Sequence, residues 1–268
     1  MSTGTATART PGGDADIARV AALFADRSRA RVLMALGDGR RLPASVLAAE
    51  AGVSAAAMSA HLNKLRAEHL VTVEQSGRHR YYSLAGPKVA ATLEALAAIA
   101  PAQPVTSLRQ GTRAQRLRYA RTCYDHLAGS LGVVVTQALI DKDVLVATDG
   151  TRDTARRPGD RLSAPVRHHP YRLGSAAGEV LGGLGVDLPA LLPGTSGSTR
   201  PVLRFCLDWT EQRHHLAGAL GAALTTALLD AGWIARRRGP REIEVTPAGA
   251  AGIEEVLGIR PAALARVR

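Results

Sequence analysis

One stretch of this 268-residue chain limits its fold more than any other, because a short amphipathic helix leads directly into a basic hairpin. Within residues 53–69, Met58, Leu62 and Leu65 recur at helical spacing and can seat the helix on a core. Residues 70–84 then predict two strands joined by a tight turn. This order of elements is typical of a winged helix-turn-helix that contacts duplex DNA.

The outer surfaces of this helix and hairpin suit a DNA duplex. The helix face opposite the apolar side chains is small and sparsely charged, as a helix that enters the major groove must be. Ser54 is a good N-cap that can also meet a phosphate, and the turn at Gly77 can present cations to the DNA backbone. From these patterns we predict DNA contacts by Ser54, Ala56, Ala60, Asn63, Lys64, Arg78, His79 and Arg80.

The segments that precede this helix complete a compact unit. Apolar stripes within residues 17–24 and 30–34 predict two helices. Leu42 and Pro43 are predicted to open a third helix, which Gly52 ends just before the DNA-contacting helix.

Five residue pairs mark the DNA-contacting helix: Val53-Ser54, Met58-Ser59, His61-Leu62, Leu65-Arg66 and Leu70-Val71. In this pattern residues 16–100 resemble the ArsR-type family of bacterial repressors. The resemblance implies base and backbone contacts from residues 54–64, with Ser59 and His61 included. It also implies phosphate contacts from the two wing arginines, Arg78 and Arg80.

The same resemblance carries expectations about assembly and metal binding. It implies a homodimer formed through the first helix and the helix near residues 87–100. The two metal motifs that such repressors often carry are absent from residues 42–52 and 87–100. Metal sensing at those two places is therefore not expected.

The charge of the chain agrees with a nucleic-acid partner. A formal net charge of +11 and a pI near 10.7 favour a polyanion. No apolar run reaches membrane-spanning length, and residues 1–15 lack the apolar centre of a secretion signal. We therefore expect a cytoplasmic protein with no membrane partner, which begins with a disordered tail.

Beyond residue 100 the chain contains an internal repeat. Residues 126–141 read HLAGSLGVVVTQALID and residues 215–230 read HLAGALGAALTTALLD, with ten of sixteen positions identical. In each copy a helix that starts at the histidine is followed by a strand, a polar tip, a second strand and a short helix near Gly178 or Gly249. This order is the second half of a winged-helix pattern. The expected fold is therefore mainly α with small β-wings (α+β), a winged helix-turn-helix followed by two degenerate winged-helix-like repeats.

These patterns also divide the chain into segments. We predict a disordered tail at 1–15, a winged helix-turn-helix DNA-binding domain at 16–100, a linker at 101–112, a first repeat at 113–200 and a second repeat at 201–268. Residues 113–268 together would form an effector-binding or dimerisation region.

A finer correspondence precedes each copy, where residues 121–125 (RTCYD) and 204–208 (RFCLD) share the pattern R-x-C-x-D. Both cysteines of the chain stand in this pattern. Two related helices packed about a pseudo-twofold axis would bring its polar groups toward one cleft, where we predict an effector site. The predicted effector-binding residues are Arg121, Cys123, Tyr124, Asp125, His126, Cys206, Asp208, Trp209 and His215.

Several effectors fit these residues. A small organic molecule in an apolar cleft is favoured, and no cofactor is then needed. Its polar and aromatic anchors would be Tyr124, His126, Trp209 and His215. A soft metal ion is an alternative, because Cys123 and His126 lie three apart on the predicted helix and can bind it together with Cys206, with Asp208 or His215 completing the site. Thiol oxidation at Cys123 and Cys206 is a third possibility, and a simple packing and dimerisation module is the fourth.

Two further features carry expectations. Residues 236–241 (RRRGPR) form a basic hairpin tip that resembles a second wing, either touching flanking DNA or lying in solvent. The glycines Gly129, Gly132, Gly218 and Gly221 disfavour a helix, so we expect them to permit close helix crossing between the repeats or, as the alternative, the close approach of a bound ligand to the backbone.

The predicted function is that of a dimeric transcriptional repressor bound to two half-sites about one helical turn apart. A small-molecule effector would release it from its double-stranded DNA operator. No nucleophile elbow, phosphate-binding glycine loop or metalloprotease helix is present in the sequence, so no enzyme is expected. A cysteine-dependent enzyme and an architectural nucleic-acid-binding protein are the remote alternatives.

Overall fold

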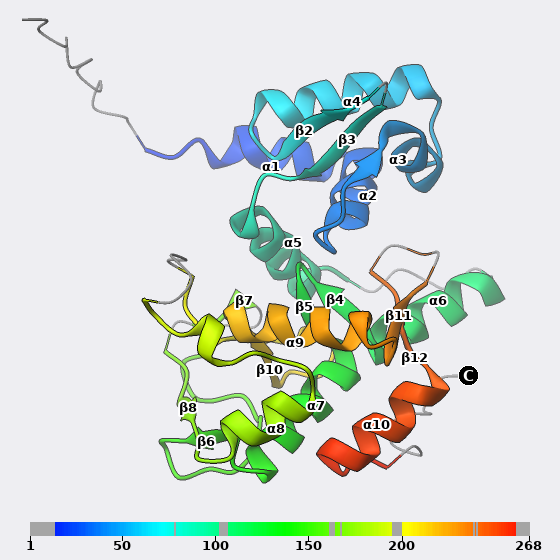
Figure 1. Cartoon of the computed structure of the whole chain (residues 1–268). Helices are drawn as coiled ribbons and strands as arrows, with labels where there is room; N and C mark the ends of the chain where they lie inside the picture. The colour runs from blue at the N-terminus through cyan, green and yellow to red at the C-terminus, as the bar shows by residue number, and fades with distance from the viewer. Residues whose placement is uncertain are drawn as a thin grey trace, which may run out of the picture.

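The computed structural model describes residues 14–77, 79–101, 107–160, 164–166, 168–194, 200–237, 239 and 241–260. An N-terminal half lies above a C-terminal half, with helix α5 (Pro87–Ile99) between them (Figure 1). Each half has its own cluster of buried apolar side chains. Nearly all of the predicted disordered tail lies outside the described residues.

The N-terminal half is a winged helix-turn-helix, as predicted. Its remaining elements are α1 (Ile17–Ala25), α2 (Arg27–Leu36), β1 (Leu42–Pro43), α3 (Ala44–Ala51), α4 (Ala55–Ala67), β2 (Val71–Ser76) and β3 (His79–Leu84). The three strands form one antiparallel sheet in the order β1-β3-β2. Met58, Leu62 and Leu65 seat α4 on the core, because their side chains are fully buried.

The start of the third helix differs from the prediction. Leu42 and Pro43 pair with Tyr82 and Tyr81 in the sheet instead of opening the helix, which begins at Ala44. An edge strand tolerates proline because it leaves some backbone N–H groups unpaired. The end of the helix is as predicted, since Gly52 adopts the left-handed conformation with φ 71°.

The C-terminal half begins with α6 (Leu108–Tyr119), which takes up the last part of the predicted linker. Two series of elements with a similar order follow. The first series is β4 (Arg121–Cys123), β5 (His126–Ala128), α7 (Gly129–Asp141), β6 (Leu145–Ala147), β7 (Ala164–Pro165), β8 (Tyr171–Leu173), α8 (Ala177–Gly183) and the 3-10 helix η1 (Pro189–Leu191). The second series is β9 (Arg204–Leu207), β10 (His214–Ala217), α9 (Gly218–Asp230), β11 (Ile234–Arg236), β12 (Ile243–Val245) and α10 (Pro247–Leu257).

The predicted helix starts at His126 and His215 are wrong. Both histidines lie in strands, and the helices begin three residues later at Gly129 and Gly218, each with φ 78°. Only glycine adopts this conformation at no cost, so these two positions turn the chain from strand into helix. Cys123 and His126 are consequently cross-strand partners, not neighbours on one helix face.

The two series pack reciprocally, since α7 lies on β10 and α9 lies on β5. The predicted helix crossing at the glycines is replaced by contact between helix and strand. A Cβ atom at Gly132 would stand 2.6 Å from the Leu127 carbonyl oxygen, and one at Gly221 would stand 2.7 Å from that of Leu216. These glycines therefore let each helix begin close against its own hairpin.

None of the helices in the described ranges is both long enough and apolar enough to cross a membrane.

Candidate DNA-binding surface and metal centre

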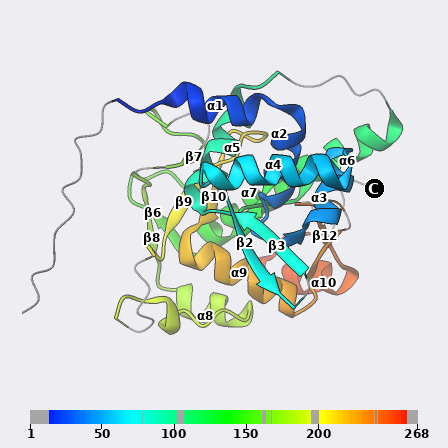
Figure 2. The same ribbon diagram turned by 90° about the horizontal axis from the view of Figure 1, so that it is seen from above.

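The outer face of α4 is open. The helix lies on the side of the molecule away from the C-terminal half (Figure 1), and it faces the viewer when the molecule is seen from above (Figure 2). The exposed side chains at this face are those of Ala56, Ser59, Ala60, Asn63 and Lys64. Contact between these residues and DNA stays a prediction.

The remaining predicted DNA contacts lie around this face. The Ser54 Oγ accepts the backbone N–H of Ala57 at 3.3 Å and so caps α4. His61 is partly buried, with its Nδ1 3.8 Å from a carboxylate oxygen of Asp26. In the wing, His79 and Arg80 are exposed, whereas Arg78 lies outside the described residues.

Four potential metal ligands converge where the two repeats meet. Cys123 and His126 are opposite each other on β4 and β5, and Cys206 and His215 are opposite each other on β9 and β10. Directly opposed residues on antiparallel strands project from the same face. The four ligand atoms consequently all lie within 4.8 Å of one another, and all four residues are buried. The imidazole rings of the two histidines are stacked, with centroids 5.2 Å apart.

The hydrogen bonding of this cluster is incomplete. The His126 Nε2 and both ring nitrogens of His215 have no hydrogen-bond partner among the described residues. Each buried polar atom without a hydrogen-bond partner lowers the free energy of unfolding. Two cysteine sulfurs and two histidine nitrogens are the ligands of tetrahedral zinc sites, where Zn–S and Zn–N distances of about 2.3 and 2.0 Å place the ligand atoms a few ångströms apart. The donor set therefore fits a soft divalent ion.

The protonation of the cluster depends on its burial. The contact with the Cys206 side chain, together with burial, raises the pKa of the Cys123 thiol well above its usual value. Burial lowers the pKa of His215 to about 3, which keeps that ring neutral. Burial also acts to lower the pKa of His126, but the neighbouring Cys123 and Asp125 outweigh it and raise the pKa to about 9. Metal binding would release protons from such a cluster.

Each histidine has an aspartate behind it. Asp125 Oδ1 lies 3.2 Å from the His126 Nδ1, and Asp208 Oδ2 lies 3.8 Å from the His215 Nδ1. Metal-binding histidines usually point their second ring nitrogen at such a group, which fixes the ring orientation. The R-x-C-x-D pattern thus supplies a sulfur and a carboxylate that lies beside the histidine of its own hairpin, within hydrogen-bonding distance for His126 but beyond it for His215.

The arginines of the pattern have different positions. Arg121 is fully buried, donates to Asp208 at 2.8 Å, and lies over the ring of Trp209 at 4.8 Å. These three predicted effector-binding residues therefore form a support behind the cluster. Arg204 is exposed, and Asp125 pairs instead with Arg200.

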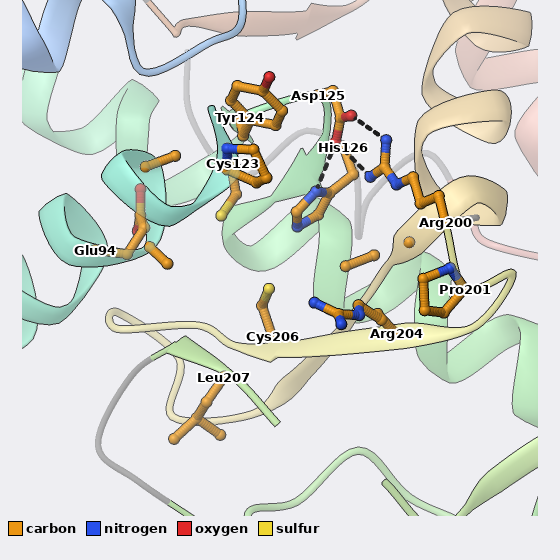
Figure 3. A pocket seen from close by; sticks show the side chains of 15 residues that line it. Glu94, Cys123, Tyr124, Asp125, His126, Arg200, Pro201, Arg204, Cys206 and Leu207 are labelled. Carbon is orange, nitrogen blue, oxygen red and sulfur yellow. Dashed lines mark hydrogen bonds and ion pairs between the residues drawn. The ribbon is translucent and has the colours of Figure 1, made fainter. Parts of the chain in front are cut away.

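A cavity of about 450 Å³ opens beside the cluster, between α5 and the hairpins (Figure 3). Its lining includes five of the predicted effector-binding residues, namely Cys123, Tyr124, Asp125, His126 and Cys206. Sequence reasoning missed Glu94, Arg200 and Arg204, which also line it. The repeated pattern could have indicated Arg204 as the counterpart of Arg121, but no sequence signal marks the other two.

Comparisons with known proteins support a winged helix-turn-helix in the N-terminal half. Residues 26–80 match the model of the MarR family. A relative from Bacillus subtilis strain 168, described as the uncharacterized HTH-type transcriptional regulator YdfF, is 36% identical over 245 residues, which cover 91% of this chain and 98% of the relative. The chain belongs to the HTH-type transcriptional regulators. It is therefore a DNA-binding transcriptional regulator of the winged-helix type.

Solved structures similar to this regulator cover about a third of it. NolR from Sinorhizobium fredii is 32% identical, with 32% of this chain and 85% of that chain covered and a TM-score of 0.30. Mb0332 from Mycobacterium bovis, described as a homodimeric winged helix-turn-helix DNA-binding domain and a possible ArsR-family regulator, is 27% identical, with 31% and 83% covered and a TM-score of 0.27.

The two halves of the regulator are joined by hydrogen bonds around Arg241. This residue is only 4% exposed, so it cannot belong to a DNA-touching or solvated second wing. Its guanidinium pairs with Glu94 of α5, its Nε donates to the Thr122 carbonyl at 2.9 Å, and its backbone N–H donates to Asp38 at 3.2 Å. One residue beyond Cys123, the N–H of Tyr124 donates to the Gly37 carbonyl at the end of α2 at 2.9 Å.

Proposed function

We propose that this regulator is a dimeric repressor whose affinity for operator DNA is controlled by a soft divalent metal ion bound by Cys123, His126, Cys206 and His215. The observation that carries the proposal is the convergence of four buried ligand atoms within 4.8 Å. Thiolate and imidazole together favour zinc or a chemically similar ion over magnesium or calcium, which prefer oxygen ligands. The sequence favoured a small organic effector, but the converging ligands favour the metal alternative.

Thiol oxidation would explain fewer residues of this cluster than metal binding does. A disulfide between Cys123 and Cys206 would use the two sulfurs and leave both histidines without a role. The unpaired nitrogens of His126 and His215 would then remain a cost without a function. A metal ion uses all four residues.

Metal binding can reach the DNA-binding half through β4. Cys123 ends this strand, and its neighbours Thr122 and Tyr124 are hydrogen-bonded to Arg241 and to Gly37. A small displacement of β4 therefore acts on the end of α2 and, through Arg241, on α5. A differential affinity of about 1–3 kcal/mol between two states is enough for a 5- to 150-fold change in DNA binding.

The dimer would form through α1 and α5. Ile17 is 75% exposed and Ile99 is 70% exposed, and Val20 and Leu96 on the same two helices are also exposed. A second copy of the chain packed on these two helices would cover these apolar side chains. A change in α5 would therefore alter the spacing of the two recognition helices on successive half-sites.

Metal analysis of the purified full-length chain tests this function. We expect one zinc or cobalt ion per chain, with the absorption of tetrahedral cobalt bound to thiolate in the cobalt form. Operator affinity, measured with and without the ion, should fall at least about fivefold when the ion binds. A chain that binds no ion, or whose operator affinity is the same in both forms, contradicts the proposal.

A further inference from the structure

The two hairpins treat equivalent aspartates differently. The Asp208 carboxylate accepts hydrogen bonds from two donors of the first repeat, the Arg121 guanidinium and the backbone N–H of Gly129, each at 2.8 Å. Gly129 is the first residue of α7, so the carboxylate also lies at a helix N-terminus. The chain thus contains a complete carboxylate-binding arrangement that its own Asp208 occupies.

The second repeat contains the equivalent donors, but the equivalent aspartate does not accept hydrogen bonds from them. Arg204 and Gly218 correspond to Arg121 and Gly129, because both arginines pair across the hairpin with the residue before the glycine. Asp125 corresponds to Asp208, but it is bound by Arg200 at 2.5 and 3.1 Å. As a result, neither the Arg204 side chain nor the Gly218 N–H has a hydrogen-bond or ion-pair partner within the described part of the chain.

Arg204 and Gly218 both line the cavity. In Figure 3 no dashed line joins Arg204 to another side chain. Much of the remaining wall is apolar and includes Pro87, Ala90 and Leu207. The other charged groups at the wall are already paired, Asp125 with Arg200 and His126, and Glu94 with Arg241. A volume of about 450 Å³ is within the usual range for small-molecule sites.

We infer that this cavity binds a small organic monocarboxylate with an apolar body. Its carboxylate takes the place beside Arg204 and the Gly218 N–H that Asp208 takes beside Arg121 and Gly129. Its apolar body lies against α5, so the ligand contacts both halves of the regulator. Neither donor is one of the four metal ligands, but Cys123, His126 and Cys206 also line the cavity, so the bound carboxylate would lie beside the proposed metal site.

Calorimetric titration of the full-length chain with benzoate and octanoate, each compared with its uncharged amide, tests the inference. We expect the carboxylates to bind and the amides to bind at least about tenfold more weakly, because hydrogen bonds to a charged group contribute more than neutral ones. R204Q should reduce carboxylate affinity about tenfold or more and leave the weak amide binding unchanged. Arg204 is exposed, so this variant is expected to fold.

R172Q is the matched control, since Arg172 is an exposed strand arginine outside the cavity lining. It should bind both carboxylates as the parent chain does. The inference is overturned if neither carboxylate binds at millimolar concentration, if acid and amide bind equally, or if R204Q and R172Q behave alike. The metal content of the same samples reports separately on the proposed function.

Discussion

The two hairpins that carry the proposed metal ligands each contribute one cysteine and one histidine but are held differently. The β4–β5 hairpin is hydrogen-bonded to the DNA-binding half through Tyr124, whereas β9 pairs with β7 within the C-terminal half. The Arg121–Asp208 ion pair is buried, whereas the Arg200–Asp125 pair is partly exposed. The two repeats thus carry similar ligands on hairpins that are attached to the rest of the protein differently. An ion that draws both hairpins together would therefore act on the DNA-binding half mainly through β4.

The difference in burial predicts the largest effect. Arg121→Leu leaves the Asp208 carboxylate buried without its cation and should lower the free energy of unfolding by about 3–5 kcal/mol. Arg200→Leu removes a cation that is 39% exposed and should cost no more than about 1 kcal/mol. Urea unfolding of both variants measures the contrast. Equal losses would mean that the two ion pairs are equivalent.

The shared ligands predict equal effects in the two hairpins. Cys123→Ser and Cys206→Ser should each weaken zinc binding more than about 100-fold, since the loss of an outer-sphere partner alone commonly costs 10- to 100-fold. Competition with a chelator of known affinity measures this. Ser130→Ala is a control, because its hydroxyl binds Glu211 and not the cluster. If only one cysteine mattered, the four-ligand site would be wrong.

The unequal attachment predicts a loss of response without a loss of metal. Glu94→Gln removes the charge that pairs with Arg241, so the metal-induced change in operator affinity should fall to less than about threefold, while zinc binding is retained. Operator titrations with and without zinc measure the change. Glu211→Gln, which lies away from the DNA-binding half, should respond as the parent chain does. A normal response in Glu94→Gln removes Arg241 from the coupling.

The smallest expected effect is that of a substitution in the DNA-binding half. Lys64→Ala should weaken operator binding and reduce its salt dependence by about one unit of slope, as expected for one lost phosphate contact. Lys142→Ala at the end of α7 is the matched control in the other half and should change neither. An unchanged slope for Lys64→Ala places that lysine outside the DNA interface.

The sequence by itself determined the winged helix-turn-helix. Met58, Leu62 and Leu65 are close in the chain, and helical periodicity is a local property, so their burial follows from their spacing. The R-x-C-x-D repeat likewise selected both cysteines and both aspartates of the site. Local patterns failed at His126 and His215, because strands of three and four residues are too short to show alternation, and the glycines that follow them fit the helical pattern as well.

Only the tertiary structure decided how these residues meet. Strand pairing places Cys123 beside His126. The packing of two hairpins that are far apart in the chain then brings Cys206 and His215 to them. The positions of Glu94, Arg200 and Arg241 depend on contacts between segments far apart in the chain. Such contacts are specified by three-dimensional packing, whereas periodicity and spacing report only on neighbours along the chain.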